Sequence, residues 1–173
     1  SVTKRFTAVA GMQLWERALV DLDAPANEYL RAFRLRPARP GLRPVTIRHL
    51  LTHTSGIPDV RHPLDLLHFD WGPFEGRPPL LSVPLGEPLP TLAEYYRAGL
   101  TSVVDPGMAF AYSNHGFAAL GQIVEDVSGL PLDQYLREHI FDPLDMDTSD
   151  LRRSRRIVGR LATGYVLGRG GPE

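Results

Sequence analysis

Hydrophobic side chains recur at helical intervals over the first twenty residues of the chain. Val2, Phe6, Val9 and Met12 follow one another at spacings of three or four residues, with polar residues between them. This pattern predicts an amphipathic helix over residues 1–20. The Asp-Leu-Asp-Ala-Pro segment that follows predicts a turn, because proline restricts the conformation of the residue before it.

Two further helices are predicted in the second half of the chain. Phe117, Leu120, Val124 and Val127 also recur at spacings of three or four residues, and Gly129 is suited to end that helix. Apolar side chains at 132, 135, 136 and 140 predict one more helix, which the Asp-Pro pair at 142–143 ends. A turn and helices are therefore expected over residues 106–141.

Capping residues predict shorter elements between these helices. Thr-Leu-Ala-Glu at 91–94 is a capping box, which starts a helix that extends to about Gly99. Thr46 is a suitable N-cap for a short helix over 47–52. The remaining predictions are a short helix over 27–33, a connector rich in arginine and proline over 34–44, and a strand over 162–167.

Residues 58–90 form the longest stretch without periodicity, and they contain half of the 16 prolines. A compact domain rarely keeps so long an irregular segment without a use for it. One interpretation is a loop that forms a wall of a binding cleft, with Phe69, Trp71 and Phe74 lining the cleft. The other is a surface loop whose aromatic side chains pack against the rest of the domain.

Composition narrows the possible functions. A chain of 173 residues is long enough for one domain or most of one. Its formal net charge of −1 argues against a general attraction to nucleic acid or to an anionic membrane. Cysteine is absent, which excludes disulfides, thiolate metal sites and cysteine nucleophiles. No apolar run reaches transmembrane length. Compartment and oligomeric state stay open.

Ser1 and Lys4 are the first candidates for chemistry. Side chains three residues apart share one face of a helix, with Cβ atoms roughly 5–6 Å apart, so a hydroxyl and an amine could exchange a proton there. Lys4 is also the only lysine of the chain, and every other basic residue is an arginine, which cannot give up its proton. An N-cap serine followed by an exposed lysine fits the same pattern.

Tyr112 and Asn114 are the second pair of candidates. They belong to a Tyr-Ser-Asn sequence just before a predicted helix, where side chains can project into a cleft. A phenol and an amine both titrate at about 10 when unperturbed, so Tyr112 beside Lys4 could share a proton and act as a base for Ser1. Asn114 could hold a substrate carbonyl and orient the lysine. A core tyrosine and a capping asparagine fit equally well.

Two other groups are less suited to chemistry. His49 and His53 are four residues apart, like two metal ligands on a helix, but no glutamate follows the first histidine and no third ligand is apparent. We therefore predict no metal site and no other cofactor. The basic run at 152–156 is predicted to be a solvated loop, because the near-neutral chain argues against a nucleic-acid arm.

Three motifs in order carry a family resemblance: Ser-x-x-Lys at 1–4, His-Leu-Leu-Thr-His-Thr-Ser-Gly at 49–56, and Pro-Gly-x-x-x-x-Tyr-Ser-Asn at 106–114. Together they resemble the serine β-lactamase-related family, which includes class C β-lactamases, D-alanyl-D-alanine carboxypeptidases and penicillin-binding-protein-like esterases. The segment at 140–146 also fits, although Asp145 stands where the family usually has glycine. The Tyr-x-Asn form points to the class C and carboxypeptidase/esterase branch.

The resemblance implies an α/β fold of the β-lactamase/transpeptidase type. It also implies a serine hydrolase that cleaves an ester or amide, such as a β-lactam, a D-Ala peptide or a carboxylic ester, through an acyl-serine intermediate. Ser1 would be the nucleophile, Lys4 its proton partner and Tyr112 the general base, while Asn114 would contact substrate and lysine. The expected partner is a small-molecule or peptidoglycan-like substrate.

One element of the family pattern is missing from the sequence. The third motif, Lys-Thr-Gly or His-x-Gly on a sheet-edge strand, supplies one oxyanion-hole N–H in the family, and Ala-Thr-Gly at 162–164 lies too early and lacks the basic residue. The strands that precede the nucleophile helix are missing as well. Residues 1–173 are therefore expected to supply mainly the helical portion of the domain, to lack most of the antiparallel sheet, to have a truncated end, and to be weakly active or inactive alone.

Two other functions remain open at this point. A non-catalytic relative could keep the helical body as a binding or scaffold domain. An N-terminal-nucleophile hydrolase would use the free α-amine of Ser1 as its base, but that class needs a layered, strand-rich fold, and this chain is predicted to be mainly helical.

Overall fold

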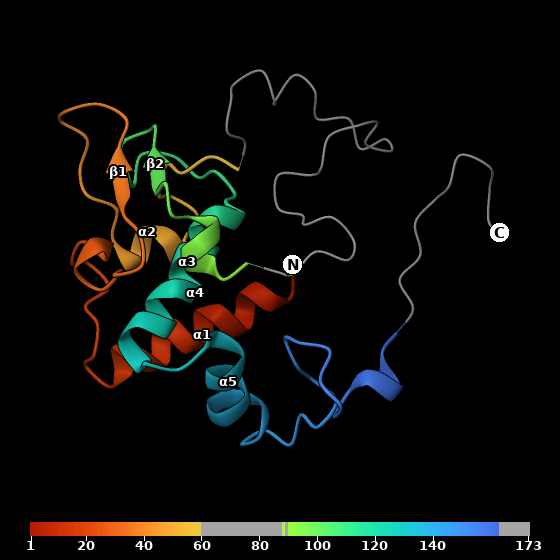
Figure 1. The fold of residues 1–173 in the computed structure, drawn as a ribbon. Helices are drawn as coiled ribbons and strands as arrows, with labels where there is room; N and C mark the ends of the chain where they lie inside the picture. The colour runs from red at the N-terminus through yellow and green to blue at the C-terminus, as the bar shows by residue number, and fades with distance from the viewer. Residues whose placement is uncertain (60–87, 89, 163–173) are drawn as a thin grey trace, which may run out of the picture.

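Helix α4 (Asn114–Ser128) lies at the centre of the fold, and the other helices pack around it (Figure 1). The structure is a computed structural model that describes residues 1–59, 88 and 90–162. Nearly every residue of α4 from His115 to Val124 is buried. The predicted helix is confirmed, and so is its end, because Gly129 adopts a φ of 74° that costs a glycine little.

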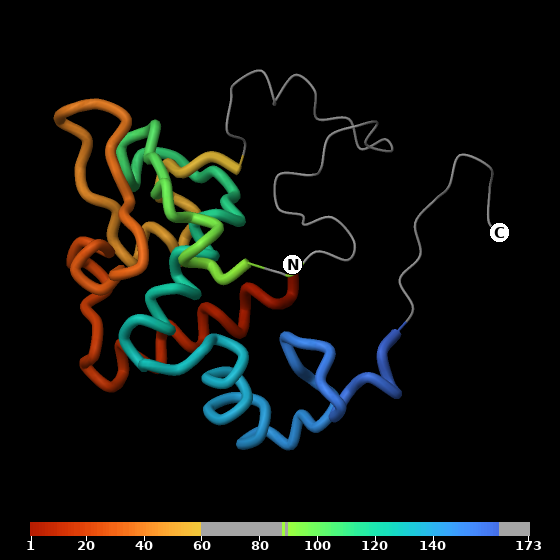
Figure 2. Tube along the Cα trace, in the orientation of Figure 1, coloured from red at the N-terminus to blue at the C-terminus, as the bar shows by residue number. Residues whose placement is uncertain are grey.

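Helix α1 (Thr3–Glu16) packs along α4, and Figure 2 shows the two traces running beside each other although they are far apart in the sequence. Gly11 faces Leu120 across this contact. A Cβ at position 11 would lie 3.2 Å from Leu120 Cδ1, so the missing side chain lets the two helices approach closely. Phe6 lies edge-on to Phe141, with ring centroids 5.1 Å apart.

The first helix is shorter than predicted, ending at Glu16 instead of near Val20. Ala18 has a left-handed φ of 54°, and the N–H of Leu19 donates to the carbonyl of Leu14 at 2.9 Å, which closes the helix. Val20 is nevertheless buried. The predicted helix was too long because the turn after it buries apolar side chains, just as a further turn of helix would.

The two predicted N-caps are confirmed. Helix α2 (Ile47–Leu51) begins after Thr46, whose Oγ1 accepts the N–H of His49 at 3.3 Å while His49 Nδ1 accepts the N–H of Thr46 at 3.2 Å. Helix α3 (Leu92–Tyr95) begins at the predicted capping box. It ends before Gly99, whose φ of 81° turns the chain into the next strand.

A two-stranded parallel sheet joins two segments that the sequence pattern left without strands. Strand β1 (Leu35–Pro37) pairs with β2 (Leu100–Ser102), and Leu35 lies opposite Leu100. The 3₁₀ helix η1 (Ala26–Glu28) replaces the longer helix predicted over 27–33. The side chain of Asn27 hydrogen-bonds both backbone groups of Leu35, at 2.8 and 2.9 Å, and so ends the helix early. No other sheet occurs in the described residues.

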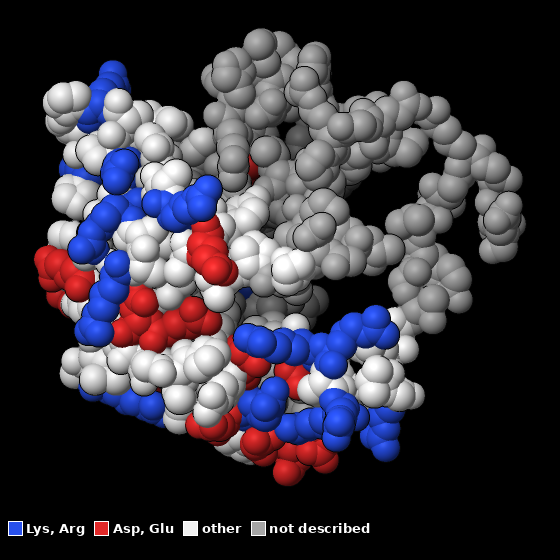
Figure 3. Space-filling view, in the orientation of Figure 1, with Lys and Arg blue, Asp and Glu red and all other residues white. Residues whose placement is uncertain are grey.

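Helix α5 (Leu132–Leu136) continues into the π-helical turn η3 (Arg137–Phe141), and together they fill the predicted helix over 132–140. The chain then runs to the short helix η4 (Val158–Arg160). Figure 3 shows basic and acidic side chains side by side over this part of the surface. The basic run is therefore paired as well as solvated: Arg152 contacts Asp133 at 2.8 Å and Arg156 contacts Asp142 at 2.7 Å.

Two predictions concern residues that the structure leaves largely undescribed. The aromatic side chains at 69, 71 and 74 and most of the strand over 162–167 lie outside the described residues. Within the described part, none of the helices combines the length and the apolar character that crossing a membrane requires.

Candidate active site

The hydroxyl of Ser1 and the amine of Lys4 meet at the start of α1. Lys4 Nζ donates to Ser1 Oγ at 3.2 Å. The N-cap position of α1 is Val2, and no side chain caps the helix, so the simple capping role that the sequence allowed for Ser1 is not the one found. Ser1 is exposed and Lys4 is half-buried, which leaves the hydroxyl open to solvent beside a fixed amine.

Asn114 reaches the same amine from the first residue of α4. Its Oδ1 accepts a short hydrogen bond from Lys4 Nζ. The N-cap of α4 is Ser113, whose Oγ accepts the N–H of Gly116 at 2.9 Å. Asn114 is therefore not the capping asparagine that the sequence also allowed, and its amide is available to contact Lys4.

Tyr112 lies beside Lys4 and is 44% exposed, so it is not the core tyrosine that was the other interpretation. Lys4 Nζ lies 4.9 Å from the centre of the Tyr112 ring. Hydrogen bonds from Lys4 and then from Ser1 lower the pKa of the Tyr112 phenol from its ordinary value of 10.0. The four residues predicted from the sequence, Ser1, Lys4, Tyr112 and Asn114, thus lie around one ammonium group.

His53 stacks against the ring of Tyr112, a role that the sequence did not indicate. Its ring stacks on the Tyr112 ring with centroids 4.4 Å apart, and its Nδ1 accepts the N–H of Ser113 at 3.1 Å. Burial, and then the charge of Lys4, lower the pKa of His53 from its ordinary value of 6.5. A neutral ring suits both contacts, because protonation of Nδ1 would remove the acceptor for Ser113.

Asp59 is the second residue that the sequence analysis missed. Its carboxylate accepts the backbone N–H of Asn114 in a short hydrogen bond and the side-chain Nδ2–H of Asn114 at 2.6 Å. No local pattern pairs position 59 with position 114, since the contact depends on how the turn after α2 folds over the start of α4. A carboxylate close after the His-Thr-Ser-Gly turn was the only available signal.

The described residues offer no metal site. No group of three histidine or acidic side chains within 1–59, 88 and 90–162 could hold an ion. His49 uses Nδ1 in the cap of α2, and His53 uses Nδ1 to accept the N–H of Ser113.

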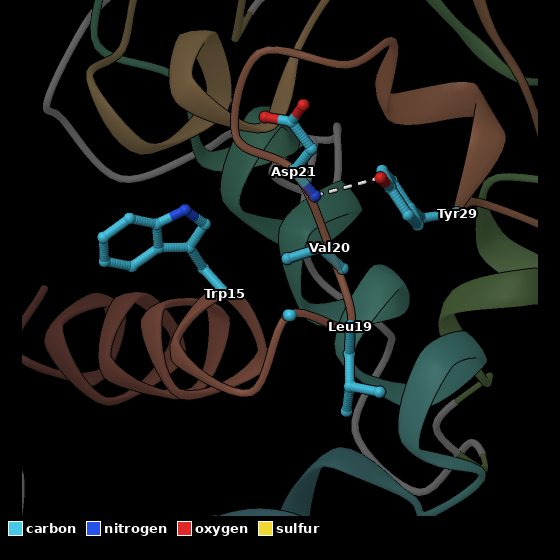
Figure 4. A pocket seen from close by; sticks show the side chains of 6 residues that line it. Trp15, Leu19, Val20, Asp21 and Tyr29 are labelled. Atoms are coloured by element: carbon cyan, nitrogen blue, oxygen red, sulfur yellow. Dashed lines mark hydrogen bonds between the residues drawn. The ribbon is translucent and has the colours of Figure 1, made fainter.

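A hollow of about 300 Å³ lies at the opposite end of α1 from Ser1. Figure 4 shows Trp15 on the last turn of α1 and, across the hollow, the hydrogen bond from the N–H of Asp21 to the Tyr29 hydroxyl, which is 2.9 Å long. None of the four candidate residues lines this hollow. It is separate from the site at the start of α1 and α4.

A family model described as Beta-lactamase matches residues 1–172 of the chain. The chain belongs to the Beta-lactamase family. Among curated relatives in this family, monacolin J acid methylbutanoyltransferase from Aspergillus terreus is 33% identical, over 90% of this chain and 38% of its own length. Penicillin-binding protein 4* from Bacillus subtilis is 27% identical, over 96% and 33%. Esterase EstB from Burkholderia gladioli is 32% identical, over 84% and 36%.

Solved structures of similar proteins agree with this assignment. A β-lactamase/D-alanine carboxypeptidase from Yersinia pestis superposes with a TM-score of 0.70 at 26% identity, covering 99% of this chain and 45% of that one. The octameric penicillin-binding protein homologue from Pyrococcus abyssi gives a TM-score of 0.66 at 30% identity, covering 99% and 36%. The predicted β-lactamase/transpeptidase-like fold and the predicted family are confirmed.

The chain spans 33 to 38% of the length of these three curated relatives. Their names describe penicillin-binding proteins, an esterase and an acyltransferase, so this Beta-lactamase family chain is related to serine hydrolases and acyltransferases.

Proposed function

We propose that this Beta-lactamase family chain carries the nucleophile and base of a serine hydrolase that cleaves an ester or amide through an acyl-serine at Ser1. The supporting observation is that Lys4 Nζ contacts both Ser1 Oγ, at 3.2 Å, and Asn114 Oδ1 while it lies over the Tyr112 ring. Candidate substrates are β-lactams, D-Ala peptides and carboxylic esters, as the names of the relatives suggest.

The proton balance of the proposed acylation favours Tyr112 as the base. Lys4 Nζ donates to Ser1 and to Asn114, and hydrogen bonds from Lys4 and from Ser1 lower the pKa of the Tyr112 phenol, which favours the phenolate that a base requires. Ser1 Oγ attacks the substrate carbonyl carbon and its proton passes to Tyr112. When the carbon–oxygen or carbon–nitrogen bond to the leaving group breaks, that group takes the proton.

A second acceptor completes the proposed cycle. Water attacks the acyl carbon and loses a proton to Tyr112. When the bond between that carbon and Ser1 Oγ breaks, Oγ takes the proton from Tyr112, and the acid and free Ser1 are released. An alcohol in place of water would give a new ester, and the name of one relative, a methylbutanoyltransferase, also describes the transfer of an acyl group. Asn114, held beside Lys4, would contact the substrate carbonyl side of the acyl group.

We further propose that the 173 residues alone turn over substrate slowly. The chain covers about a third of each relative, and the third family motif is not in its sequence. The loss of one oxyanion-hole donor costs roughly 10²- to 10³-fold in rate. Ester turnover by this chain at the rate of a complete enzyme would contradict this second proposal without touching the first.

A fluorophosphonate probe tests the nucleophile directly. Ser1 Oγ displaces fluoride from phosphorus, the hydroxyl proton passes to the base, and a stable covalent adduct remains. Intact-mass measurement should show one adduct on the wild-type chain and none on Ser1→Ala. An unlabelled wild-type chain would overturn the proposal and favour a binding or scaffold domain. Loss of labelling when residues are added before Ser1 would instead favour catalysis by the α-amine.

A further inference from the structure

Asp59 sits between the turn that follows α2 and the first turn of α4. Its carboxylate accepts three N–H groups from two residues: the backbone and side-chain N–H of Asn114, and the backbone N–H of His115 at 3.4 Å. Two of these donors are backbone amides at the start of α4, where helix N–H groups lack partners within the helix. The third donor belongs to a side chain of the candidate site.

The side-chain contact fixes which way the Asn114 amide points. An asparagine amide presents a carbonyl oxygen on one side and an NH₂ group on the other. Asp59 Oδ2 accepts from Nδ2 at 2.6 Å, so the NH₂ group faces Asp59 and Oδ1 faces Lys4 Nζ. A rotation of the amide by half a turn would place its N–H donors against the Lys4 ammonium.

The backbone of Asp59 is held in place independently of its carboxylate. His115 Nε2 lies 3.1 Å from the Asp59 carbonyl oxygen, and His115 Nδ1 lies 2.9 Å from the Tyr96 hydroxyl. His115 and Tyr96 are both buried. The carboxylate therefore projects from an anchored backbone, which is what a group that orients another side chain requires.

We propose that Asp59 is a positioning residue for acylation of Ser1: by accepting the Asn114 NH₂ group it holds Oδ1 of Asn114 toward Lys4. The proposal rests on the proposed function, because it concerns the same acylation. It extends the site by one residue that acts through Asn114 and contacts no reacting atom.

Two substitutions separate this role from simple helix capping. Asp59→Asn keeps an oxygen for the backbone amides but places an NH₂ group against that of Asn114, so the Asn114 amide turns toward Lys4 the wrong way. Asp59→Ala removes that conflict and leaves the amide free to take the productive orientation part of the time. Positioning therefore predicts labelling rates in the order wild type, Asp59→Ala, Asp59→Asn, with the last reduced roughly 10- to 100-fold.

A capping role alone predicts the opposite order for the two variants. Asparagine caps helices about as well as aspartate does, whereas alanine is a poor cap. Under that role Asp59→Asn would label like wild type and Asp59→Ala would be the slower variant. Thermal unfolding of both variants is measured alongside, and we expect Asp59→Ala to be the less stable although it is the faster to label.

Asp126 provides a matched control. Its carboxylate also accepts two backbone N–H groups, from Arg31 at 2.6 Å and Ala32 at 3.2 Å, and one side-chain amide, from Gln122 at 3.0 Å. It lies far along α4 from Asn114. Asp126→Asn should lower stability and leave the fluorophosphonate labelling rate of the folded chain unchanged.

The outcomes distinguish the two proposals. If wild type is not labelled, the proposed function fails and the role of Asp59 fails with it. If wild type is labelled and Asp59→Asn is labelled as fast, only the role of Asp59 is overturned. Labelling that is slow in Asp59→Asn, intermediate in Asp59→Ala and normal in Asp126→Asn supports it.

Discussion

Oxygen atoms of three residues, Ser1, Asn114 and Tyr112, are hydrogen-bond partners of Lys4 Nζ. Ser1 Oγ and Asn114 Oδ1 accept directly, and a hydrogen bond from Lys4 is the largest cause of the lowered pKa of Tyr112. In the proposed reaction Lys4 thus holds Ser1 and Asn114 in place and lowers the pKa of Tyr112. Tyr112 is the group whose proton changes.

Replacement of Tyr112 tests that division of roles. The labelling rate of the wild-type chain should rise with pH and level off above the pKa of Tyr112, which lies below its ordinary value of 10.0. Tyr112→Phe should lose this rise and about 100-fold or more of the rate, as loss of a general base does. Tyr29→Phe, which removes a hydroxyl at the distant hollow, should keep the wild-type profile.

The four motif residues could be predicted from the sequence, but the residues that hold them in place could not. Ser1 and Lys4 are neighbours within one helix, and Tyr112 and Asn114 belong to one recognisable turn, so local spacing identified them. Whether they meet is a matter of tertiary packing, which the family resemblance implied. His53 and Asp59 contact residues more than fifty positions away, and no local pattern in a single sequence pairs positions so far apart.

At the scale of elements, the turn after α2 carries both His53 and Asp59, the two residues that contact Tyr112 and Asn114. Gly56 lets this turn lie against the segment after β2: its carbonyl accepts the N–H of Val103 at 2.9 Å. It has a φ of 69°, and a Cβ there would lie 2.2 Å from the carbonyl oxygen of Val104. Both the conformation and the space exclude a side chain.

A methyl group at position 56 should therefore be costly. Gly56→Ala combines a left-handed backbone with a collision against a backbone oxygen, so we expect a loss of more than about 2 kcal/mol in the free energy of unfolding. Gly41→Ala is the matched variant, because Gly41 has a φ of 89° and nothing within 4 Å of its Cβ position. It should lose only the roughly 1–2 kcal/mol of the backbone term. Equal urea midpoints for the two variants would contradict this explanation.

Helix starts were predicted better than helix ends and strands. Thr46 and Thr91 satisfy backbone N–H groups a few residues away, so the sequence records both partners of each cap. Strand β1 exists because Leu35 pairs with Leu100, far along the chain, and three residues of strand leave no periodicity to detect. The end of α1 depends on the left-handed residue Ala18, which is no recognisable signal, and α3 ends at Tyr95, before the glycine at 99 that the sequence offered as its end.

At the scale of the whole molecule, one hydrophobic core around α4 holds the described fold together, and two half-buried histidines, His49 and His53, make its stability depend on pH. Burial is the main cause that lowers the pKa of His49 and of His53 from 6.5. The folded chain therefore binds a proton at these sites less readily than the unfolded chain does. Their contribution to stability is complete above pH 6.5 and declines as the pH falls from there toward the lowered pKa values.

The free energy of unfolding should accordingly be smaller at pH 5.5 than at pH 7.5. Carboxylates with lowered pKa values, such as Asp105, lose their contribution only at more acidic pH. His49→Asn keeps an acceptor for the N–H of Thr46 but cannot titrate, so its stability should fall less between these two pH values. Urea denaturation of both chains measures the difference, and parallel losses would exclude His49 as a source.

Gly11 bears indirectly on the candidate site, because it sets how closely α1, which carries Lys4, can lie against α4, which begins at Asn114. Helices α1 and α4 meet there with Leu120 only 3.2 Å from the vacant Cβ position, and both helices point their first turns at the site. A methyl group at position 11 would press on Leu120, so we expect it to move the first turns of α1 and α4 apart and to weaken the contact between Lys4 and Asn114. Engineers often replace helical glycines with alanine to gain heat tolerance; at this position the same substitution would trade reactivity for rigidity.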